Sequence, residues 1–262
     1  MLGNDFFRRL YIQVSRYLFG RKFLRVMDGP LEGYLWSTAC SYEYILGNYE
    51  DPLTVKTFLS WLNPETTFYD LGGNAGFYAL LANRYISQGK IYSFEPIPAA
   101  QELFQQHVKL NTVQIRHQNI RLLPYALSDS EKQVAFSNDA SRQDGNTYIQ
   151  ESSVFNHAEQ YLTIHCYSVD GLLKLQYNKP DVIKIDVEGA EYDVLKGAMD
   201  TLRTYKPNLL LATHDCHLPG VKDKCITLLE ELGYQLTHTG GHNKNLPGLD
   251  DYIAIHKTKL HS

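Results

Sequence analysis

Hydrophobic positions in most of the chain follow two alternating spacings, one typical of strands and one typical of amphipathic helices. Short apolar runs predict strands at residues 66–71, 91–95, 122–127, 182–187, 209–213, 234–238 and 252–256. Apolar residues that recur every three or four positions predict helices at residues 76–85, 99–110, 169–175, 192–201 and 222–232. Because strands alternate with helices, we expect an α/β fold with a mostly parallel sheet, helices on both faces and a closing hairpin.

Two polar stretches interrupt this alternation. Residues 128–165 are weakly patterned, and only residues 133–136 and 162–166 predict short strands there. We expect this stretch to be an insertion that shapes the substrate side of the domain. Residues 240–248 form a second polar loop, which we expect to cover the bound substrate.

The first part of the chain has a different pattern. Residues 5–26 predict an amphipathic helix, with an apolar face made of Phe7, Leu10, Tyr11, Val14, Tyr17 and Leu18. Basic residues lie on the opposite face and just after it: Arg9, Arg16, Arg21, Lys22 and Arg25. Such a helix docks on the main domain or a second subunit, or it lies on an anionic membrane surface. The pattern leaves these alternatives open.

Between this helix and the alternating region, turn-forming residues dominate. Glycines and a proline predict irregular structure over residues 27–50, and residues 52–62 predict a helix that Asn63 and Pro64 stop. We therefore expect an N-terminal helical extension and cap at residues 1–50 and a main domain at residues 51–262.

Composition narrows the classes of function. The chain has 262 residues, 44% of them hydrophobic, and a net charge of −4, so nucleic acid is not an expected partner. The four cysteines form no CxxC pair, which predicts reduced thiols and a cytoplasmic protein; they are Cys40, Cys166, Cys216 and Cys225. No signal-peptide pattern and no apolar run long enough to span a bilayer is visible.

The strongest local motif joins the first strand of the alternating region to its helix. Asp70 ends the strand, and Gly72 and Gly73 follow, so that the backbone can turn tightly and approach a ligand. In a dinucleotide site a carboxylate here would repel the pyrophosphate at the helix N-terminus. A carboxylate suits a cationic ligand instead, and S-adenosylmethionine carries both an ammonium and a sulfonium group.

A second motif lies at the end of the next strand. Glu95 and Pro96 follow the apolar residues 91–94. An acidic side chain at this place can accept hydrogen bonds from both hydroxyls of a ribose. Nicotinamide enzymes also carry an acid here, so Glu95 alone does not choose the cofactor. The chain lacks a Gly-x-Gly-x-x-Gly run, which disfavours a nicotinamide-dependent oxidoreductase.

These motifs resemble those of the FkbM-type methyltransferases. The resemblance is carried by residues 69–78 (YDLGGNAGFY), 94–96 (FEP) and 183–191 (IKIDVEGAE), and it covers about residues 45–215. Residues 46–50 (LGNYE) and 168–172 (SVDGL) also resemble family segments. One departure is visible, because Gly73 stands where the family motif has an alanine.

The resemblance implies a seven-stranded Rossmann-like methyltransferase sheet whose last strand is antiparallel, with S-adenosyl-L-methionine as cofactor. Family members are mostly O-methyltransferases acting on natural products or sugars, and some methylate nitrogen. We therefore expect a small-molecule or glycan acceptor, with N-methylation of an amine and a non-catalytic binding domain as alternatives. The expected cofactor contacts are Glu50, Asp70, Gly72, Gly73, Asn74, Gly76, Phe77, Glu95, Pro96, Ala126 and Asp186.

Candidate catalytic residues follow the strand at residues 182–187. Lys184, Asp186 and Glu188 alternate, which in a strand places all three side chains on one face. A hydroxyl is a weak nucleophile, so a general base within hydrogen-bonding reach would help methyl transfer. The crowding of carboxylates, including Glu191, is expected to raise at least one pKa, which favours Asp186 as the base or as a group that orients the acceptor.

His214, at the end of the next strand, is the competing base, because histidine titrates near neutral pH. His217 is expected at the loop surface. Asp186, Glu188, His214 and Asp215 could together supply ligands for a divalent metal ion. Their spacing is not diagnostic of a metal site, so no metal is expected.

Overall fold

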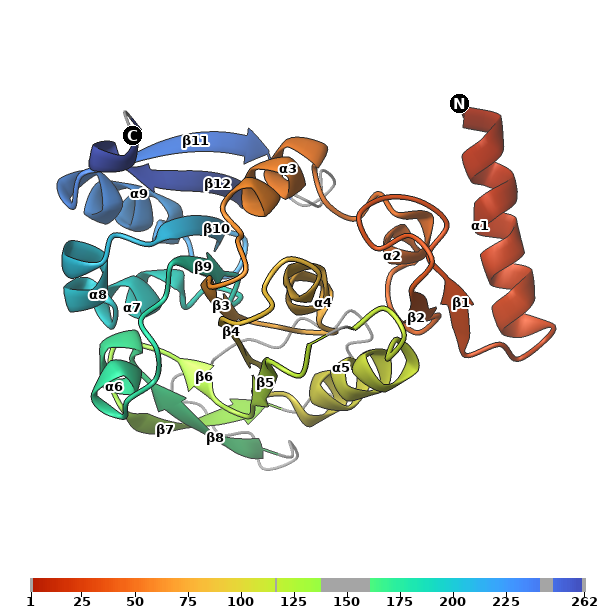
Figure 1. Ribbon diagram of the computed structural model, residues 1–262, viewed down its shortest axis with the longest axis horizontal. Coiled ribbons are helices and arrows are strands. Elements are labelled where there is room, and N and C mark those ends of the chain that lie inside the picture. Colours follow the sequence, from red (N-terminus) through yellow and green to blue (C-terminus); the bar gives the residue numbers. More distant parts are fainter. Residues whose placement is uncertain (1, 116, 138–160, 241–246, 261–262) are drawn as a thin grey trace.

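The computed structural model describes residues 2–115, 117–137, 161–240 and 247–260, and its centre is a seven-stranded sheet (Figure 1). In spatial order the strands are β11 (Tyr234–Gly240), β12 (Leu249–His256), β10 (Asn208–His214), β9 (Val182–Ile185), β3 (Thr67–Leu71), β4 (Lys90–Phe94) and β5 (Ile120–Leu123). All neighbouring pairs are parallel except those that involve β12, the last strand in the sequence. The predicted fold class is confirmed.

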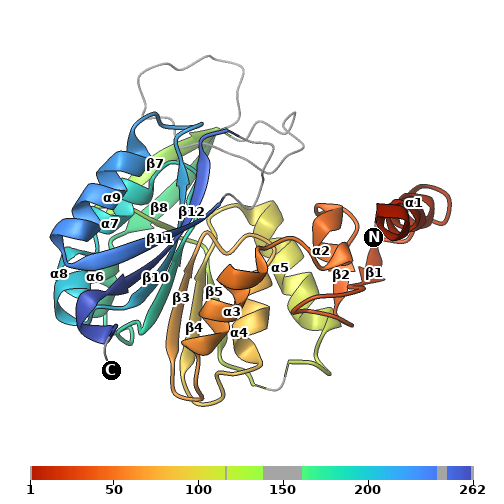
Figure 2. The ribbon, with the colours of Figure 1, turned by 90° about the horizontal axis from the view of Figure 1, so that it is seen from above.

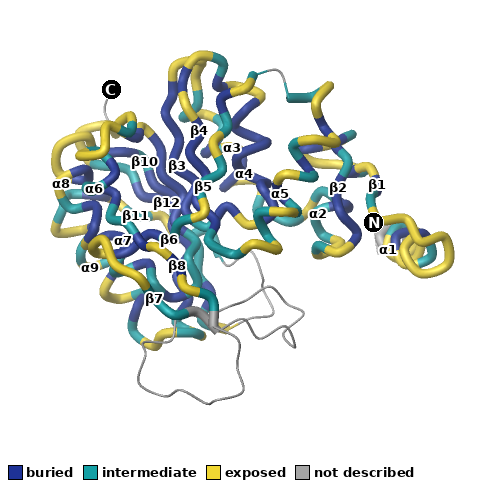
Figure 3. The backbone as a smooth tube through the Cα atoms, turned by 90° about the horizontal axis from the view of Figure 1, so that it is seen from below, coloured by how far each residue is buried: buried dark blue, intermediate teal, exposed yellow. Residues whose placement is uncertain are grey.

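Helices cover both faces of this sheet (Figure 2). One face carries α3 (Pro52–Ser60), α4 (Phe77–Asn83) and α5 (Pro98–Leu110). The other carries α6 (Val169–Lys174), α7 (Glu191–Lys196), α8 (Met199–Thr204) and α9 (Val221–Glu231). The period-two alternation of the strands explains this arrangement, because Phe68 faces the first layer whereas Tyr69 and Leu71 face the second. Figure 3 shows the central strands as the most deeply buried part of the chain.

A three-stranded sheet lies beside the main one. It consists of β6 (Ala126–Leu127), β8 (Tyr161–Tyr167) and β7 (Lys132–Ser137), in that spatial order. The two short strands predicted within residues 128–165 are therefore confirmed. The continuous strand predicted at residues 122–127 is wrong, because Pro124 has no N–H for the ladder and the chain leaves the main sheet there.

The N-terminal prediction needs a larger correction. The helix α1 (Leu2–Tyr17) ends nine residues earlier than expected; Gly20 then adopts a φ of +59°, and Phe23–Arg25 forms strand β1. Residues 27–50 are more ordered than predicted, since Leu35–Ser37 forms strand β2, paired with β1, and Tyr42–Leu46 forms helix α2. The pairing partners of such three-residue strands leave no periodic signal in the sequence.

Side chains of α5 hold this N-terminal segment against the main domain. The side chain of Asn111 accepts a hydrogen bond from the N–H of Leu35 and donates one to its carbonyl, as a neighbouring strand would. His107 accepts from the N–H of Ser37 through Nε2 and donates through Nδ1 to the carbonyl of Ala75. Burial lowers the pKa of His107 to about 4, so the ring is neutral. It bridges β2 to the turn that follows β3 and contains Gly72, Gly73 and Ala75, called the glycine turn below.

The helix predicted at residues 192–201 is two short helices, α7 and α8. Asp170, far away in the sequence, accepts hydrogen bonds from the backbone N–H groups of Asp200 and Thr201 and from the hydroxyl of Thr201. A carboxylate that satisfies these N–H groups starts a new helix at this place. Among the described helices, none is long and apolar enough to cross a bilayer.

Candidate active site

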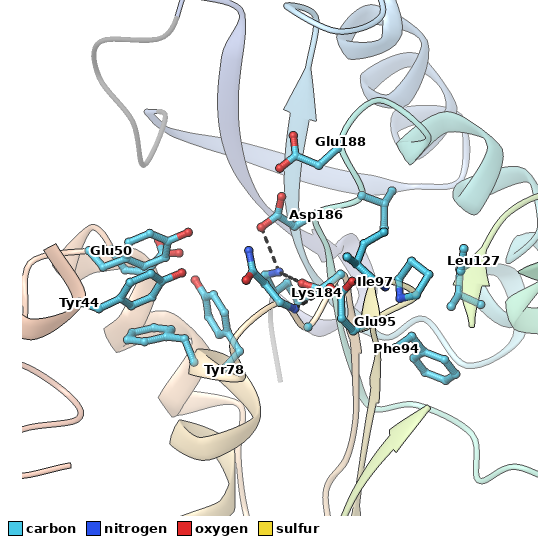
Figure 4. Close-up of a pocket in the computed structure, with 18 residues that line it drawn as sticks. Tyr44, Glu50, Tyr78, Phe94, Glu95, Ile97, Leu127, Lys184, Asp186 and Glu188 are labelled. Atoms are coloured by element: carbon cyan, nitrogen blue, oxygen red, sulfur yellow. Dashed lines mark hydrogen bonds and ion pairs between the residues drawn. The ribbon is translucent and has the colours of Figure 1, made fainter. Parts of the chain in front are cut away.

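A pocket opens at the carboxyl ends of β3, β4 and β9, where an open α/β sheet binds its ligands (Figure 4). Residues from four predicted motifs line it, together with the predicted contact Ala126: Glu50, Gly72, Gly73, Asn74, Phe77, Glu95, Pro96, Lys184, Asp186 and Glu188. The other lining residues are Tyr44, Tyr49, Tyr78, Phe94, Ile97, Leu127 and Val187. Of the predicted site residues, Asp70, Gly76 and His214 do not line the pocket.

The glycine turn forms the floor of the pocket. Gly72 adopts a φ of +80°, and a side chain there would place its Cβ 1.8 Å from the carbonyl oxygen of Asp186. The N–H groups of Gly72 and Gly73 both donate to the carbonyl of Phe94, at 3.0 Å. Only glycine fits at position 72, because both the backbone angle and the approach of the neighbouring strand exclude a side chain.

Gly73, the departure from the family motif, is explained by Ser93. A Cβ at position 73 would lie 2.0 Å from Ser93 Oγ, and that hydroxyl donates a 2.9 Å hydrogen bond to Asp70 Oδ2. The serine hydroxyl thus occupies the space that an alanine methyl group would need.

We expect Gly73→Ala to lower the free energy of unfolding by about 1–3 kcal/mol, the usual cost of overpacking. The same change should cost less than half as much in a Ser93→Ala background, because the clashing oxygen is then gone. Urea unfolding of the four proteins of this double-mutant cycle measures the difference. An equal cost in both backgrounds would show that Ser93 is not the obstacle.

Asp70 lies under the pocket floor instead of facing the ligand. Its side chain is 1% exposed, accepts from Ser93, and has Oδ1 3.8 Å from Lys184 Nζ. Burial raises the pKa of Asp70, although Lys184 and Ser93 oppose that rise. The structure does not place Asp70 against the pocket, because a lysine 114 residues later in the sequence lies beside it as its cationic partner.

Lys184 connects the floor to the pocket wall. Its ammonium lies 3.0 Å from Asp186 Oδ2 and donates to the carbonyl of Gly72 at 3.1 Å. Burial lowers the pKa of Lys184, but the neighbouring Asp186 and Asp70 outweigh it and raise the value above its ordinary range. The lysine therefore stays charged and orients the glycine turn and Asp186 together.

Glu95 is placed as predicted, just after β4 and facing the pocket. Its two carboxylate oxygens accept hydrogen bonds from the N–H groups of Asn74 (2.9 Å) and Ile97 (2.8 Å). Burial raises the pKa of Glu95 to about 7, against the opposing effect of these two donors. Each oxygen retains a lone pair that can accept from a ligand hydroxyl.

A stack of aromatic rings supports another wall of the pocket. The sequence pattern does not predict this stack. The rings of His107, Trp36, Tyr44 and Tyr49 follow one another at centroid distances of 4.0, 5.0 and 3.7 Å. Tyr44 and Tyr49 line the pocket together with Glu50. Figure 4 shows Tyr44 beside Glu50. The tyrosines concentrated at residues 42–49 are the sequence signal that could have indicated this wall. Only the next residue, Glu50, is predicted as a cofactor contact.

The catalytic candidates are arranged differently from the predicted strand. Because β9 ends at Ile185, only Lys184 and Asp186 keep the alternation, and Glu188 lies in a turn with a φ of +56°. Both Asp186 and Glu188 still line the pocket, above Lys184 in Figure 4.

His214 is buried behind these carboxylates. Its Nδ1 lies 2.8 Å from Glu191 Oε1, and its Nε2 lies 3.3 Å from Glu188 and 3.6 Å from Asp186. Burial lowers the pKa of His214, but Glu191, Asp186 and Glu188 outweigh it and raise the pKa to about 9. The ring nitrogens face Glu191 on one side and Asp186 and Glu188 on the other, and the raised pKa favours a cation at Nε2. With its Nε2 lone pair engaged in this way, His214 is disfavoured as the general base.

Two neighbouring predictions also change. The side chain of His217 is 6% exposed rather than on the surface, because it stacks on His214 and lies 3.1 Å from Glu188. Asp215 turns away from the carboxylates and accepts from the N–H of Lys222 at the start of α9. Asp215 therefore caps a helix and does not belong to the carboxylate cluster.

The fold and the pocket together define a Rossmann-like methyltransferase. Residues 70–236 match the family described as the methyltransferase FkbM domain, and the chain belongs to that family. The chain is 24% identical over 194 residues to the protein named Methyltransferase sdnD from Sordaria araneosa, covering 64% of this chain and 73% of that protein.

Two further comparisons, one of sequence and one of fold, also find methyltransferases. The protein named Hexuronic acid methyltransferase AglP from Haloferax volcanii is 24% identical over 151 residues, which are 57% of each chain. The crystal structure of methyltransferase FkbM from Methylobacillus flagellatus KT superposes with a TM-score of 0.51 and 16% identity. That match covers 73% of this chain and 44% of the crystallised one, so this chain spans less than half of the length of that protein.

Proposed function

We propose that the chain is an S-adenosylmethionine-dependent O-methyltransferase that acts on a hydroxyl group of a sugar, a glycan or a natural product. The observation that carries the proposal is the pocket itself. A glycine turn forms its floor, Glu95 offers two carboxylate oxygens on one side, and Glu50 and Asp186 offer negative charge on the other. This arrangement complements a ligand that has a ribose at one end and two cationic groups at the other.

Methyl transfer then requires a proton acceptor close to the donor methyl group. Asp186 lines the pocket and is oriented by Lys184, so it is the residue that we assign to this role. The acceptor oxygen forms a bond to the methyl carbon as the bond from carbon to sulfur breaks. The hydroxyl proton passes to the Asp186 carboxylate, and the donor leaves as neutral S-adenosylhomocysteine.

The charge of the pocket also bears on the acceptor. Glu50, Asp186 and Glu188 line the pocket, and Lys184, the one lysine among the described lining residues, is already paired with two carboxylates. A neutral polyhydroxylated acceptor suits this environment better than a carboxylate, even though one relative is named for hexuronic acid. The same carboxylates would attract an amine, and N-methylation of an amino sugar is therefore the second candidate.

Calorimetric titration with S-adenosylhomocysteine tests the cofactor assignment, with NAD as the control ligand. We expect one S-adenosylhomocysteine per chain and no binding of NAD. Binding of NAD alone would contradict the proposal.

Binding should depend on pH through Glu95. The ribose hydroxyls need an ionised acceptor, so affinity for S-adenosylhomocysteine should rise with pH and level off above the pKa of about 7. Below that pKa the limit for one proton is about tenfold in affinity per pH unit. The stability of the cofactor-free protein should change in the opposite sense.

The opposite sense follows because the folded-state pKa of Glu95 is raised above the ordinary value of 4.5. The folded protein then holds this proton more tightly than the unfolded chain, and the contribution of Glu95 to stability is lost as pH rises from 4.5 to about 7. Calorimetry and urea unfolding across this range measure both effects. A Glu95→Gln variant should lose both pH dependences, and an unchanged profile in that variant would assign them to another group.

A further inference from the structure

Two carboxylates of the pocket wall and the histidine buried behind them converge on one point. Asp186, Glu188 and His214 each offer a ligand atom, and these atoms lie within 4.8 Å of one another. We propose that this Asp186–Glu188–His214 triad binds a divalent cation of the Mg²⁺ or Mn²⁺ class. Binding of the cation is independent of the proposed function, whereas its role in methylation, stated below, rests on it.

The hydrogen bonding of His214 supports the proposal. Glu191 is fully buried, and its Oε1 accepts from the N–H of Gly189 (2.9 Å) and from Nδ1 of His214 (2.8 Å). Because a carboxylate cannot donate, Nδ1 must carry the proton, and Nε2 is the atom directed at Asp186 and Glu188. A histidine that ligates a metal characteristically donates its other N–H to a carboxylate in this way.

Because His214 is buried, the charge that its Nε2 faces must be balanced by a nearby positive charge. The histidine side chain is 1% exposed, yet its Nε2 points at two carboxylate oxygens 3.3 and 3.6 Å away. Without a positive charge between them, the nitrogen lone pair and the carboxylates would repel one another. A proton on His214, a proton on His217, which lies 3.1 Å from the same Glu188 oxygen, or a metal ion can supply that charge. Only the metal ion predicts stoichiometric binding in a titration with Mn²⁺.

The donor set selects the kind of ion. Two carboxylates and one imidazole suit a hard or borderline divalent cation, and three protein ligands leave coordination positions for other oxygens. Because Asp186 and Glu188 line the pocket, an acceptor with neighbouring hydroxyl groups could take those positions. The cation would then hold the reacting oxygen and lower the pKa of its hydroxyl group.

Titration of the full chain with Mn²⁺, followed by loss of the paramagnetic signal of the free ion, tests the site. We expect one bound Mn²⁺ per chain, and at least about tenfold weaker binding in Glu188→Gln, which removes a ligand that is only partly buried. His238→Ala is the matched control, because His238 also faces a carboxylate, Asp250 at 2.9 Å, but lies outside the triad. It should bind Mn²⁺ as the wild type does.

Absence of stoichiometric Mn²⁺ binding, or equal binding by Glu188→Gln, would overturn the cation site and leave the proton on His214. S-adenosylhomocysteine binding is measured on the same samples. Binding of S-adenosylhomocysteine without Mn²⁺ would refute this inference alone. Binding of Mn²⁺ without S-adenosylhomocysteine would refute the proposed cofactor and leave the cation site intact.

A separate observation concerns α1, which stands at the edge of the molecule (Figures 1 and 2). Ile12 and Ser15 are buried toward the rest of the chain. Apolar side chains on the opposite side of the helix and in the turn after it are 44–76% exposed: Phe6, Phe7, Leu10, Tyr11, Tyr17, Leu18 and Phe19. The first helix thus packs by one narrow side on the rest of the N-terminal segment, next to α2, and leaves its apolar face uncovered by the described residues.

Charge indicates what covers this face. Residues 1–26 contain six basic residues and one acidic residue in a chain of net charge −4. Arg8 and Arg9 lie 3.9 Å from Asp28 and Glu43, and the remaining basic residues are Arg16, Arg21, Lys22 and Arg25. A second copy placed face to face would oppose two positive segments, whereas an anionic lipid surface complements them. Arg16, Arg21 and Lys22 are exposed beside the apolar face. We infer that α1 docks on an anionic membrane surface, with its aromatic side chains in the interface.

Sedimentation of the full chain with phosphatidylcholine vesicles, with and without phosphatidylserine, tests this inference. Binding should require phosphatidylserine, weaken with salt, and fall at least about tenfold when Phe7→Glu and Leu10→Glu are combined. Val113→Glu, at a position 88% exposed elsewhere, is the control and should bind normally. No binding to phosphatidylserine vesicles would overturn the inference. Self-association that the double variant abolishes would assign the face to a second copy instead.

Discussion

Lys184→Met should lower the free energy of unfolding by about 3–5 kcal/mol, the usual cost of removing one partner of a buried ion pair. Lys184 is 7% exposed, and its ammonium group lies near Asp70, Asp186 and the carbonyl of Gly72. Methionine has a similar length but leaves Asp70 buried without a cation. S-adenosylhomocysteine binding should also be lost, because the glycine turn and Asp186 lose their common anchor.

The loss should be smaller at acidic pH. Burial already raises the pKa of Asp70, so without Lys184 this carboxyl takes up a proton more readily and the uncompensated charge disappears. Urea unfolding at two pH values, together with calorimetry, measures both effects. Lys196→Met removes an exposed lysine paired with Asp193 and should change stability little. Equal, small changes in both variants would show that the buried network is not important for stability.

Glu95→Gln should weaken binding of S-adenosylhomocysteine about 100-fold at pH 8, which corresponds to about 2–3 kcal/mol for losing hydrogen bonds to a charged group. The amide can offer only one oxygen, whereas Glu95 uses both oxygens toward Asn74 and Ile97 and is proposed to receive the ribose hydroxyls as well. An NH₂ group would then face a backbone N–H or a ribose hydroxyl that needs an acceptor.

Calorimetry at pH 8 measures this loss directly. Glu102→Gln makes the same chemical change on an exposed turn of α5 and is the matched control. It should bind S-adenosylhomocysteine as tightly as the wild type. A loss of less than about threefold in Glu95→Gln would remove Glu95 from the cofactor site.

Local motifs explain why much of the site could be predicted from the sequence. The glycine turn and Glu95 are set by short-range geometry, because a strand that enters a helix through glycines places them at one edge of the sheet. The alternation of strands and helices likewise predicted the class of fold. The ends of helices and strands are predicted less well inside apolar runs. Strand β5 stops just before Pro124, and α1 ends at Tyr17, shortly before Gly20 turns the chain.

The roles of Asp70 and His214 could not be predicted, because their ionic partners lie far away in the sequence. Asp70 was expected to face the ligand, but the side chain that neutralises it, Lys184, lies on a strand 114 residues later. His214 was expected to be a base because histidine titrates near neutral pH. Its buried contact with Glu191 raises the pKa to about 9 instead. No periodicity in the sequence reports such partners.

In the N-terminal segment, too, contacts between distant residues could not be predicted from the sequence. The apolar spacing of residues 5–26 predicted a helix but could not show which side of it is covered. The structure shows that only a narrow side, with Ile12 and Ser15, packs on the rest of the N-terminal segment. The aromatic stack that brings Glu50 to the pocket depends on His107 and Trp36, which lie about 70 positions apart.

Transfer of the methyl group from [methyl-¹³C]-S-adenosylmethionine tests the central claim most directly. The full chain, with Mn²⁺ present, is incubated with neutral methyl glycosides, a glucuronide and an amino sugar, and the products are followed by carbon NMR. We expect a methoxy signal on a neutral glycoside, with one S-adenosylhomocysteine formed for each methyl group transferred. A methyl group found only on nitrogen, or only on the glucuronide carboxylate, would contradict this expectation.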